Sequence, residues 1–435
     1  MEISESITRV DFSYSNEASF DGPVRYHYVV DLDKDGVDEL IAYGFETQPN
    51  TPVEYENTKI SIFGWQGNEF VNLTSKWLPD GGDQVEAVGD VVSGDFNGDG
   101  LIDFYASANA DMDYQINAYQ FINQGGFFTK EIVKTSEWEH GVAVYDLNKD
   151  GYDDIVPVGW SSLGNTILGG PTGLSTPITL VAYGAGVAVA DFLGDGSVSM
   201  ITTDSGSASG ELDDTRLFRL FLEEFSYAEE VAALPLPILE GMGLSSHDVR
   251  VRAYDFSMDG LDDAVIFSHY LGRRSSVQFL ENSGNGVFQD VTENFLKNYD
   301  DQTSSSYSPQ FLDVNDDGRI DLFLSEPLYD ELENSTGILL QGQDGVYVDS
   351  YRSEFSKIMN DSSLASILTG PNNQKFVVID DAWAEGGLNN GGRAWLNLYE
   401  ISFSERDESE TLKDTVLNDT IYGMGGNDTI SLTSG

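Results

Sequence analysis

The nine residues from Asp31 to Glu39, DLDKDGVDE, recur with small changes along the whole chain. Close copies are DFNGDGLID from Asp95, DLNKDGYDD from Asp146, DFSMDGLDD from Asp255 and DVNDDGRID from Asp313, and a degenerate copy, DFLGDGSVS, starts at Asp191. Successive copies start 64, 51, 45, 64 and 58 residues apart. This spacing is typical of one four-stranded propeller blade per repeat, with connecting loops of variable length.

Each copy lies between two apolar runs of strand length. YHYVV precedes Asp31 and GVAVY precedes Asp146, while ELIAYGF and DIVPVGW begin at the ninth residue of the same two loops. A third run and a Gly-rich turn follow in each unit, as in YQFINQGGFF from Tyr119, which predicts a strand, a hairpin turn and another strand. We therefore predict an all-β protein in which each unit is a four-stranded meander.

A seventh unit lacks the acidic loop and has only three predicted strands, within 364–370, 375–383 and 393–401. The N-terminal stretch 7–14, ITRVDFSY, alternates apolar and polar residues and has no partner of its own. We predict that it supplies the missing outer strand and closes a seven-bladed ring, because closure removes exposed sheet edges.

Oxygen-bearing side chains occupy positions 1, 3, 5 and 9 of the five complete copies, and Gly occupies position 6. Alternate oxygens on a tightly curled backbone, with a main-chain carbonyl at position 7, form the oxygen cage that Ca²⁺ prefers. The sequence therefore predicts about five bound Ca²⁺ ions. The predicted ligands are Asp31, Asp33, Asp35, Val37 and Glu39; Asp95, Asn97, Asp99, Leu101 and Asp103; Asp146, Asn148, Asp150, Tyr152 and Asp154; Asp255, Ser257, Asp259, Leu261 and Asp263; and Asp313, Asn315, Asp317, Arg319 and Asp321.

Two other interpretations of these loops fit less well. An EF-hand needs Glu at position 12 and flanking helices, but position 12 falls in the predicted strands, for example at Ala42 and Leu324. Simple Asp-Gly β-turns with solvent-facing acids would not require the same four oxygen positions in five copies. The degenerate loop carries Leu193 and Ser199 at ligand positions 3 and 9, so we predict no ion there.

The composition limits the partners. The 435 residues include 22 Lys and Arg against 74 Asp and Glu, a formal charge of −52 that would repel nucleic acid and anionic membranes. The chain has no Cys, which excludes disulfides and thiol catalysis. The opening residues do not read as a secretory signal, and no apolar run is long enough for a membrane helix, so membrane insertion is not expected.

The acidic loops and their strands resemble the FG-GAP or VCBS repeats of integrin-α-like seven-bladed β-propellers, whose D-x-[DN]-x-D-G-x-x-D loops bind calcium. The resemblance covers residues 7–402. It implies a seven-bladed propeller with calcium loops between the first and second strands of most blades, but it implies little about activity, because fold does not fix function.

Residues 403–435 are predicted to be a polar linker followed by truncated nonapeptide repeats. VLNDTIY with Asp419 and GMGGNDTIS with Asp428 lie nine residues apart and resemble the G-G-x-G-x-D-x-U-x repeat of RTX β-rolls. The alternative is a Gly-rich disordered tail. The resemblance implies a monomeric module of a longer bacterial polypeptide that is secreted or displayed on the cell surface.

The edge opposite the predicted calcium loops gathers aromatic and polar residues just before the inner strands or in the longer second-to-third loops. Such groups suit recognition of a glycan or a peptide on a target surface. The predicted ligand-binding residues are Tyr26, His27, Glu86, Trp138, His140, Trp160, Tyr183, His247, Tyr270 and Trp383.

These features favour a calcium-dependent, carbohydrate- or peptide-binding adhesion module over an enzyme. The alternative is a carbohydrate-active enzyme similar to propeller-based polysaccharide lyases, with His140 or His247 and Tyr26 or Tyr183 as acid and base. No G-x-S-x-G, H-E-x-x-H or P-loop motif supports catalysis, and no catalytic residue is assigned.

Overall fold

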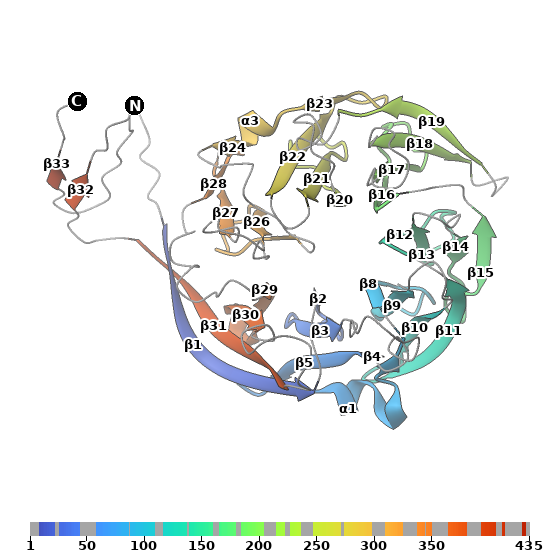
Figure 1. Ribbon diagram of the computed structural model, residues 1–435, viewed down its shortest axis with the longest axis horizontal. Coiled ribbons are helices and arrows are strands. Elements are labelled where there is room, and N and C mark those ends of the chain that lie inside the picture. Colours follow the sequence, from blue (N-terminus) through green and yellow to red (C-terminus); the bar gives the residue numbers. More distant parts are fainter. Residues whose placement is uncertain are drawn as a thin grey trace.

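The computed structural model describes residues 8–21, 26–43, 58–86, 88–108, 116–136, 139–159, 165–179, 184–203, 215–221, 227–235, 247–270, 274–297, 309–324, 337–343, 345–349, 364–380, 393–405, 411–413 and 429–431. Seven antiparallel sheets are arranged around a common axis and form the blades of a propeller (Figure 1). We number the blades 1 to 7, starting with the sheet that contains Tyr26.

Each blade is a four-stranded meander whose first strand lies nearest the axis (Figure 1). Blade 1 contains β2 (Tyr26–Val30), β3 (Glu39–Tyr43), β5 (Ser61–Gln66) and β6 (Glu69–Asn72). Blade 2 contains β8 (Val88–Gly94), β9 (Asp103–Ala108), β10 (Ile116–Asn123) and β11 (Phe128–Ser136). Blade 3 contains β12 (Gly141–Tyr145), β13 (Asp154–Val158), β14 (Asn165–Leu168) and β15 (Thr176–Thr179). Blade 4 contains β16 (Gly186–Ala190), β17 (Ser199–Thr203), β18 (Arg216–Phe221) and β19 (Tyr227–Ala233).

The last three blades follow the same plan with additions. Blade 5 contains β20 (His247–Ala253), β21 (Ala264–Tyr270), β22 (Arg274–Asn282) and β23 (Phe288–Asp290). Blade 6 contains β25 (Gln310–Leu312), β26 (Asp321–Leu324), β27 (Gly337–Gln341) and β28 (Tyr347–Asp349), and β24 (Leu296–Lys297) joins it parallel to β28. Blade 7 contains β29 (Leu364–Thr369), β30 (Lys375–Asp380), β31 (Arg393–Glu405) and β1 (Thr8–Asp21).

A few short elements lie outside the blades. β4 (Thr58–Lys59) pairs with β7 (Gln84–Val85), and β32 (Thr411–Lys413) pairs in parallel with β33 (Thr429–Ser431). The described helices are α1 (Thr74–Trp77), α3 (Thr292–Phe295) and the 3₁₀ turns η2 (Pro79–Gly81) and η3 (Pro371–Asn373). Among the described residues, no helix is long and apolar enough to cross a membrane.

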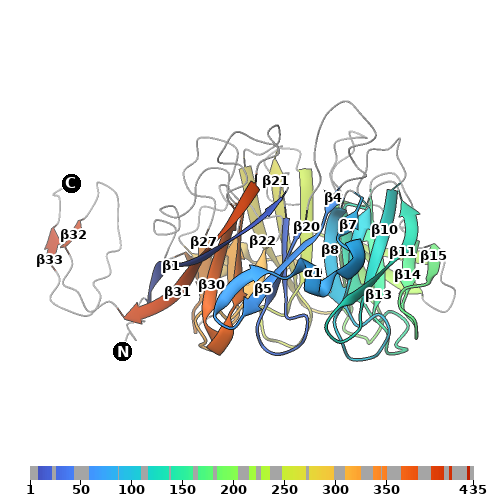
Figure 2. The ribbon, with the colours of Figure 1, turned by 90° about the horizontal axis from the view of Figure 1, so that it is seen from below.

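The N-terminal strand is longer than the stretch 7–14 suggests. β1 is the outer strand of blade 7 and runs antiparallel to β31, from Thr8 opposite Glu405 to Asp21 opposite Arg393, with an irregularity after Tyr14. Its partner β31 is itself 13 residues long, so backbone pairing continues beyond the alternating residues that mark the strand in the sequence. Figure 2 shows the two long strands side by side.

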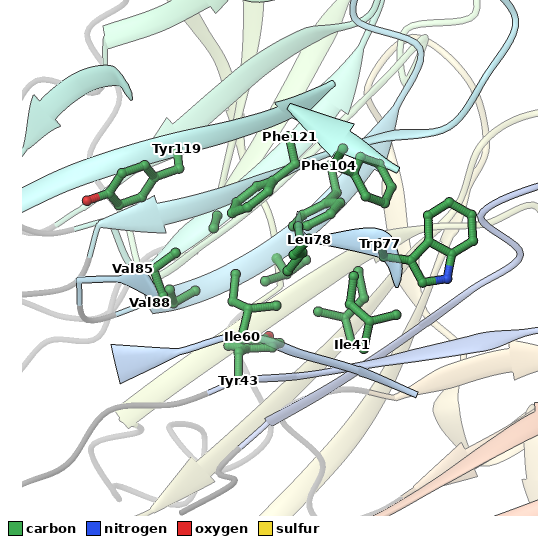
Figure 3. Close-up of a cluster of buried hydrophobic side chains, with 14 of the residues drawn as sticks. Ile41, Tyr43, Ile60, Trp77, Leu78, Val85, Val88, Phe104, Tyr119 and Phe121 are labelled. Carbon is green, nitrogen blue, oxygen red and sulfur yellow. The ribbon is translucent and has the colours of Figure 1, made fainter. Parts of the chain in front are cut away.

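The hydrophobic core consists of seven clusters, one between each pair of neighbouring blades in the described residues. Between blades 1 and 2, Ile41 of β3 lies near Phe104 of β9 and Phe121 of β10 (Figure 3). Between blades 7 and 1, Phe376 of β30 shares a cluster with Leu40 of β3. Packing therefore runs around the whole ring, and both faces of each blade are covered.

We expect Phe104→Ala to destabilise the protein by about 3–5 kcal/mol, because it removes a fully buried ring between two blades. Phe104 is 0% exposed, and its ring centroid lies 4.1 Å from that of Phe121 and 4.8 Å from that of Phe128. The control is Phe127→Ala, at a residue that is 43% exposed, which should change stability by less than about 1 kcal/mol. Urea unfolding measures both, and equal losses would contradict this assignment of the core.

Candidate metal centres

Six loops, each joining the first strand of a blade to the second, lie at one end of blades 1 to 6 and share one hydrogen-bonding pattern. We call them loops 1 to 6, after their blades. In loop 3, Asp146 at position 1 accepts the N–H of Asp150 (3.1 Å) with one oxygen and that of Gly151 (2.9 Å) with the other. Asp150 at position 5 in turn accepts the N–H of Tyr152 (3.1 Å). The same three bonds recur in the other five loops.

The backbone of every loop turns through the left-handed region at positions 4 and 6. In loop 1 the φ angles of Lys34 and Gly36 are 58° and 86°. This conformation strains most side chains but not Gly, which explains the invariable Gly at position 6 of the repeat. The curl lets the carboxylates of positions 1 and 5 accept main-chain N–H groups of their own loop.

The ninth residue of each complete loop is a buried acid that ties the loop to the blade. Asp103 accepts the N–H of Phe96 in its own loop (3.1 Å) and the N–H of Asn123 at the end of the third strand (2.8 Å). Asp154 and Asp321 make the equivalent pairs of bonds. Asp263 accepts the N–H of Ser257, at position 3 of its loop, and that of Asn282, and Glu39 accepts the N–H of Leu32 (3.0 Å). The ninth acid therefore connects loop, second strand and third strand.

Burial disfavours the charged form of these acids. Desolvation raises the pKa of Glu39 to about 8, of Asp103 and Asp321 to about 7, and of Asp154 to about 6. Backbone N–H groups lower each pKa, but the acidic neighbours at other loop positions raise it further. Each loop thus gathers negative charges that a bound cation would stabilise.

Loop 1 offers the most complete donor set. Oxygen atoms of Asp31, Asp33 and Glu39 all lie within 4.8 Å of one another. Carboxylate oxygens at this separation suit a hard divalent cation such as Ca²⁺, so the residues present fit the expected ion. Loops 2, 3 and 6 place Asn97, Asn148 and Asn315 at position 3, and loop 5 places Ser257 there, so each supplies one charge fewer.

Loop 4 keeps the same backbone but has a built-in positive charge. Arg219 of β18 contacts Asp195 at position 5 (2.8 Å) and the hydroxyl of Ser197 (2.7 Å). Leu193 is buried at position 3, and the Ser199 hydroxyl at position 9 donates to the carbonyl of Ala190 (2.9 Å). A guanidinium therefore occupies the role that a metal ion would have, in the loop for which no ion is expected.

Loop 6 has both an acid at position 9, Asp321, and an arginine beside the acid at position 5. The guanidinium of Arg319 contacts Asp317 at position 5 and donates to the carbonyl of Gln341 (2.6 Å). Sequence reasoning assigned Arg319 only a main-chain carbonyl and did not consider its side chain. An ion in loop 6 would share Asp317 with this cation.

Sequence reasoning also missed the acids at position 8. Asp153 in loop 3 accepts the N–H of Asp95 in loop 2 (2.8 Å), and Asp38 in loop 1 accepts the N–H of Thr369 in blade 7 (2.6 Å). Asp262 occupies the same position in loop 5, whereas loops 2, 4 and 6 have Ile or Val there. This alternation between odd and even blades is visible in the sequence and could have indicated contacts between blades.

At the opposite end of the ring the prediction is wrong for His27. Its side chain is 2% exposed, since it lies between blades 1 and 7 with Nδ1 3.3 Å from the Ser366 hydroxyl. Burial lowers its pKa to about 3. His27 is therefore a buried, neutral residue whose side chain offers almost no exposed surface to a ligand.

The other described residues at this end have more open positions. Tyr26 is half-buried with its ring 5.5 Å from that of Tyr43. Glu86 is half-buried, but its carboxylate accepts the side-chain N–H of Asn117 (2.7 Å) and the hydroxyl of Tyr119 (3.3 Å). These bonds hold Glu86 in place and reduce its capacity for a ligand.

The remaining predicted ligand-binding residues are described only in part. His140 is half-buried and follows Glu139, and its carbonyl accepts the guanidinium of Arg250 from blade 5. His247 begins β20 opposite His269, and Tyr270 ends β21 opposite Arg274. Trp138, Trp160, Tyr183 and Trp383 lie outside the described residues.

Comparison with known proteins supports the repeat and the fold. The profile of the FG-GAP-like repeat matches residues 95–156 and 251–324, which contain loops 2, 3, 5 and 6. A search of curated proteins gives no match. Among solved structures the chain is similar to the crystal structure of BBS1N in complex with ARL6DN soaked with mercury, with a TM-score of 0.50 and 9% identity over 90% of this chain and 97% of that chain. The lead-soaked crystal of the same complex gives a TM-score of 0.47 with the same identity and coverage. The chain therefore contains FG-GAP-like repeats within a seven-bladed propeller.

We expect the stability of the ion-free protein to fall as the pH rises. The ninth acids have pKa values above their ordinary range near 4, so the folded state holds their protons more tightly than the unfolded state. Their effect is unfavourable once the pH passes from about 4 through the folded values of about 6 to 8. Urea unfolding in EDTA at high NaCl, which screens the general charge, should give a lower free energy of unfolding at about pH 8 than at about pH 5. An equal value at the two pH values would contradict the assigned burial.

Proposed function

We propose that the chain is a calcium-dependent ligand-binding module of adhesion type, in which five loops hold Ca²⁺ and the opposite end of the ring presents a binding surface. The observation that carries the proposal is the convergence of Asp31, Asp33 and Glu39 in loop 1, together with the repetition of that loop geometry around the ring. FG-GAP-like propeller repeats favour a binding module over an enzyme, although fold alone does not fix function.

The comparison of loops within the chain supports the number of ions. Loops 1, 2, 3, 5 and 6 keep an acid at position 9, whereas loop 4 has Ser199 there and Arg219 beside Asp195. Loop 4, which lacks the ninth acid, is thus a loop in which an arginine takes the place of the proposed ion. Loop 6 keeps the ninth acid but also has an arginine, Arg319, beside Asp317. This substitution is the pattern expected if positive charge is needed in each loop and Ca²⁺ supplies it in five of them.

The N-terminal strand and the C-terminal residues fit the proposed context. Pairing of β1 with β31 supports closure of the ring by the N-terminal strand. In the tail, Thr411 pairs in parallel with Thr429, an offset of 18 residues and twice the nonapeptide period. This register supports an RTX-type roll, and with it our proposal of a monomeric module of a secreted or surface-displayed bacterial protein.

The proposed ligand is a glycan or a peptide on a target surface. Without the buried His27, the described residues that remain of the predicted site are Tyr26, Glu86 and His140, with His247 and Tyr270 on blade 5. Aromatic and polar side chains of this kind suit stacking on sugar rings or on peptide side chains.

Calcium should stabilise the fold. Extracellular modules bind Ca²⁺ with dissociation constants near ~10⁻⁴ to 10⁻³ M, and a tenfold excess contributes RT ln 11, or about 1.4 kcal/mol per site. Five sites give about 7 kcal/mol, comparable to the net stability of a domain. Thermal melts with Ca²⁺ and with EDTA measure the difference, and identical melts would remove calcium from the proposal.

Asp146→Asn and Asp191→Asn form a matched pair for this test. Each wild-type acid accepts two backbone N–H groups at equivalent positions of its loop, so the substitutions remove equal capping interactions. In EDTA the two variants should lose similar stability. In Ca²⁺ only Asp146→Asn should lose at least about 1.4 kcal/mol more, because of these two loops only loop 3 is expected to hold an ion.

Ligand binding should require the folded, calcium-loaded ring. We expect a glycan array and a peptide array to give specific binding in Ca²⁺ that is lost in EDTA. Asp313→Asn, at the loop end, should affect affinity only as far as stability falls, whereas His247→Ala should weaken binding at least about tenfold with an unchanged melting temperature. Binding that survives His247→Ala and His140→Ala would move the site away from this end of the ring.

A further inference from the structure

Loops 1 and 2 contact each other directly. The ammonium group of Lys34, at position 4 of loop 1, donates to the carbonyl of Gly100 at position 6 of loop 2 (2.6 Å). The side-chain amide of Asn123, from the third strand of blade 2, donates to the carbonyl of Leu32 in loop 1 (3.1 Å). Asn123 is also the residue whose N–H binds the ninth acid of loop 2, Asp103. A shift of either loop would therefore displace hydrogen-bond partners of the other loop.

Loops 2 and 3 are joined more tightly. Asp153, at position 8 of loop 3, accepts the N–H of Asp95 with its carboxylate (2.8 Å) and donates its own N–H to the carbonyl of Asp95 (3.0 Å). Asp95 is the first expected ligand of loop 2, and Asp153 directly precedes Asp154, the last ligand of loop 3. The ring of Tyr152 lies so close to Gly98 that a Cβ there would come within 2.8 Å of it. One residue thus fixes the main chain of a ligand in the neighbouring loop.

The charge distribution adds to this link. Asp153 is half-buried, and the negative charges of Asp95 in loop 2 and Asp146 in loop 3 both act on it. A cation in either loop would reduce the electrostatic repulsion at Asp153, to which acids of both loops contribute. Geometry and charge therefore favour joint occupancy of the two loops.

The hydrogen bonds of loops 5 and 6 to neighbouring blades lead to loop 4 and blade 7, where no ion is expected. Asp262 of loop 5 interacts with the main-chain N–H of Asp191 in loop 4, and Asn282 donates to the carbonyl of Phe192 (2.9 Å). Loop 6 contacts blade 7 through Asp316, which accepts the amide of Asn373 (3.0 Å). Between loops 5 and 6, the described part of the chain contains no hydrogen bond. Among the described contacts, loops 1, 2 and 3 are therefore the ion-competent loops that hydrogen-bond to one another.

We propose that the calcium sites of loops 1, 2 and 3 are coupled and fill cooperatively, with Asp153 as the positioning residue between loops 2 and 3, whereas loops 5 and 6 bind independently. This inference rests on the proposed calcium binding of the five loops. By thermodynamic linkage, an ion in loop 3 raises the Ca²⁺ affinity of loop 2 by the same factor by which an ion in loop 2 raises the Ca²⁺ affinity of loop 3. Couplings of this type amount to about 5- to 150-fold.

The first test is a calorimetric Ca²⁺ titration of the full chain with single loops disabled. Asp146→Asn should remove the loop 3 site and also weaken the loop 1 and loop 2 sites at least about fivefold. Asp313→Asn should remove the loop 6 site and leave the other affinities unchanged. Loss of one site with no change elsewhere in both variants would overturn the coupling.

The second test isolates Asp153 with Asp262→Asn as the matched control. Both acids occupy position 8 and bind the first residue of the preceding loop, but Asp262 contacts loop 4, which is not expected to hold an ion. Asp153→Asn should keep five sites while the cooperativity among loops 1 to 3 falls, which a purely structural role would not produce. Asp262→Asn should keep the wild-type titration at a similar cost in stability.

The outcomes separate this inference from the proposed function. Five independent sites in wild type, together with calcium-dependent stability, would overturn the coupling and leave the calcium proposal standing. Equal loss of cooperativity in Asp153→Asn and Asp262→Asn would overturn the role of Asp153. An absence of Ca²⁺ binding by the wild-type chain would overturn both proposals.

Discussion

The buried acid at the ninth loop position is the interaction on which five of the seven blades depend. In blade 2, Asp103 begins the second strand, closes the loop through Phe96 and reaches the third strand through Asn123. One carboxylate thus sets the loop conformation and the register of two strands. Blade 4 shows what a neutral substitute can do, because the Ser199 hydroxyl still accepts the N–H of Phe192 (3.0 Å) but donates to the carbonyl of Ala190 at the end of the first strand, and it makes no bond to the third strand among the described contacts. The acid gives the stronger anchor, and its burial creates a need for positive charge.

Positive charge reaches the acids of the loops in different ways. Blade 4 uses Arg219, and loop 6 has Arg319 beside an acid that an ion would also contact. At the turn of blade 7, Lys375 lies 3.6 Å from Asp316 of loop 6. With only 22 basic residues in the chain, side chains cannot compensate 74 acids, so most of the charge is left to solvent ions or to bound Ca²⁺. The acidic composition and the loop geometry are therefore two aspects of one constraint.

The sequence predicts the repeating features well because they are local. Alternating oxygens followed by Gly at position 6 are enough to define the loop, and apolar runs on each side define the strands. Contacts between blades join residues far apart in the sequence and are much harder to predict from it. In YHYVV, Tyr28 faces blade 2 and bonds the Ser93 hydroxyl (2.9 Å), while His27 faces blade 7. Both faces of a blade are covered, so no polar alternation tells which residues are buried, and His27 was placed wrongly for that reason. Arg219 lies 24 residues after Asp195, and its pairing depends on how β18 folds back.

The two ends of the ring are held by different means. At the loop end, neighbouring blades are joined by acids and by the main chain they bind. At the other end, the guanidinium of Arg250 from blade 5 reaches the carbonyls of His140 in blade 3 and Ala185 before β16, and lies 3.8 Å from Asp90 in blade 2. These contacts of Arg250 link blades 2, 3, 4 and 5 through protein groups alone. If the loops hold Ca²⁺ as proposed, we expect its removal to act on the proposed binding end only through the stability of the ring, since Arg250 holds the main chain at His140. A calcium requirement for ligand binding would then follow the loss of folded protein, with no intermediate state in which the ring is intact and the surface around His140 is altered.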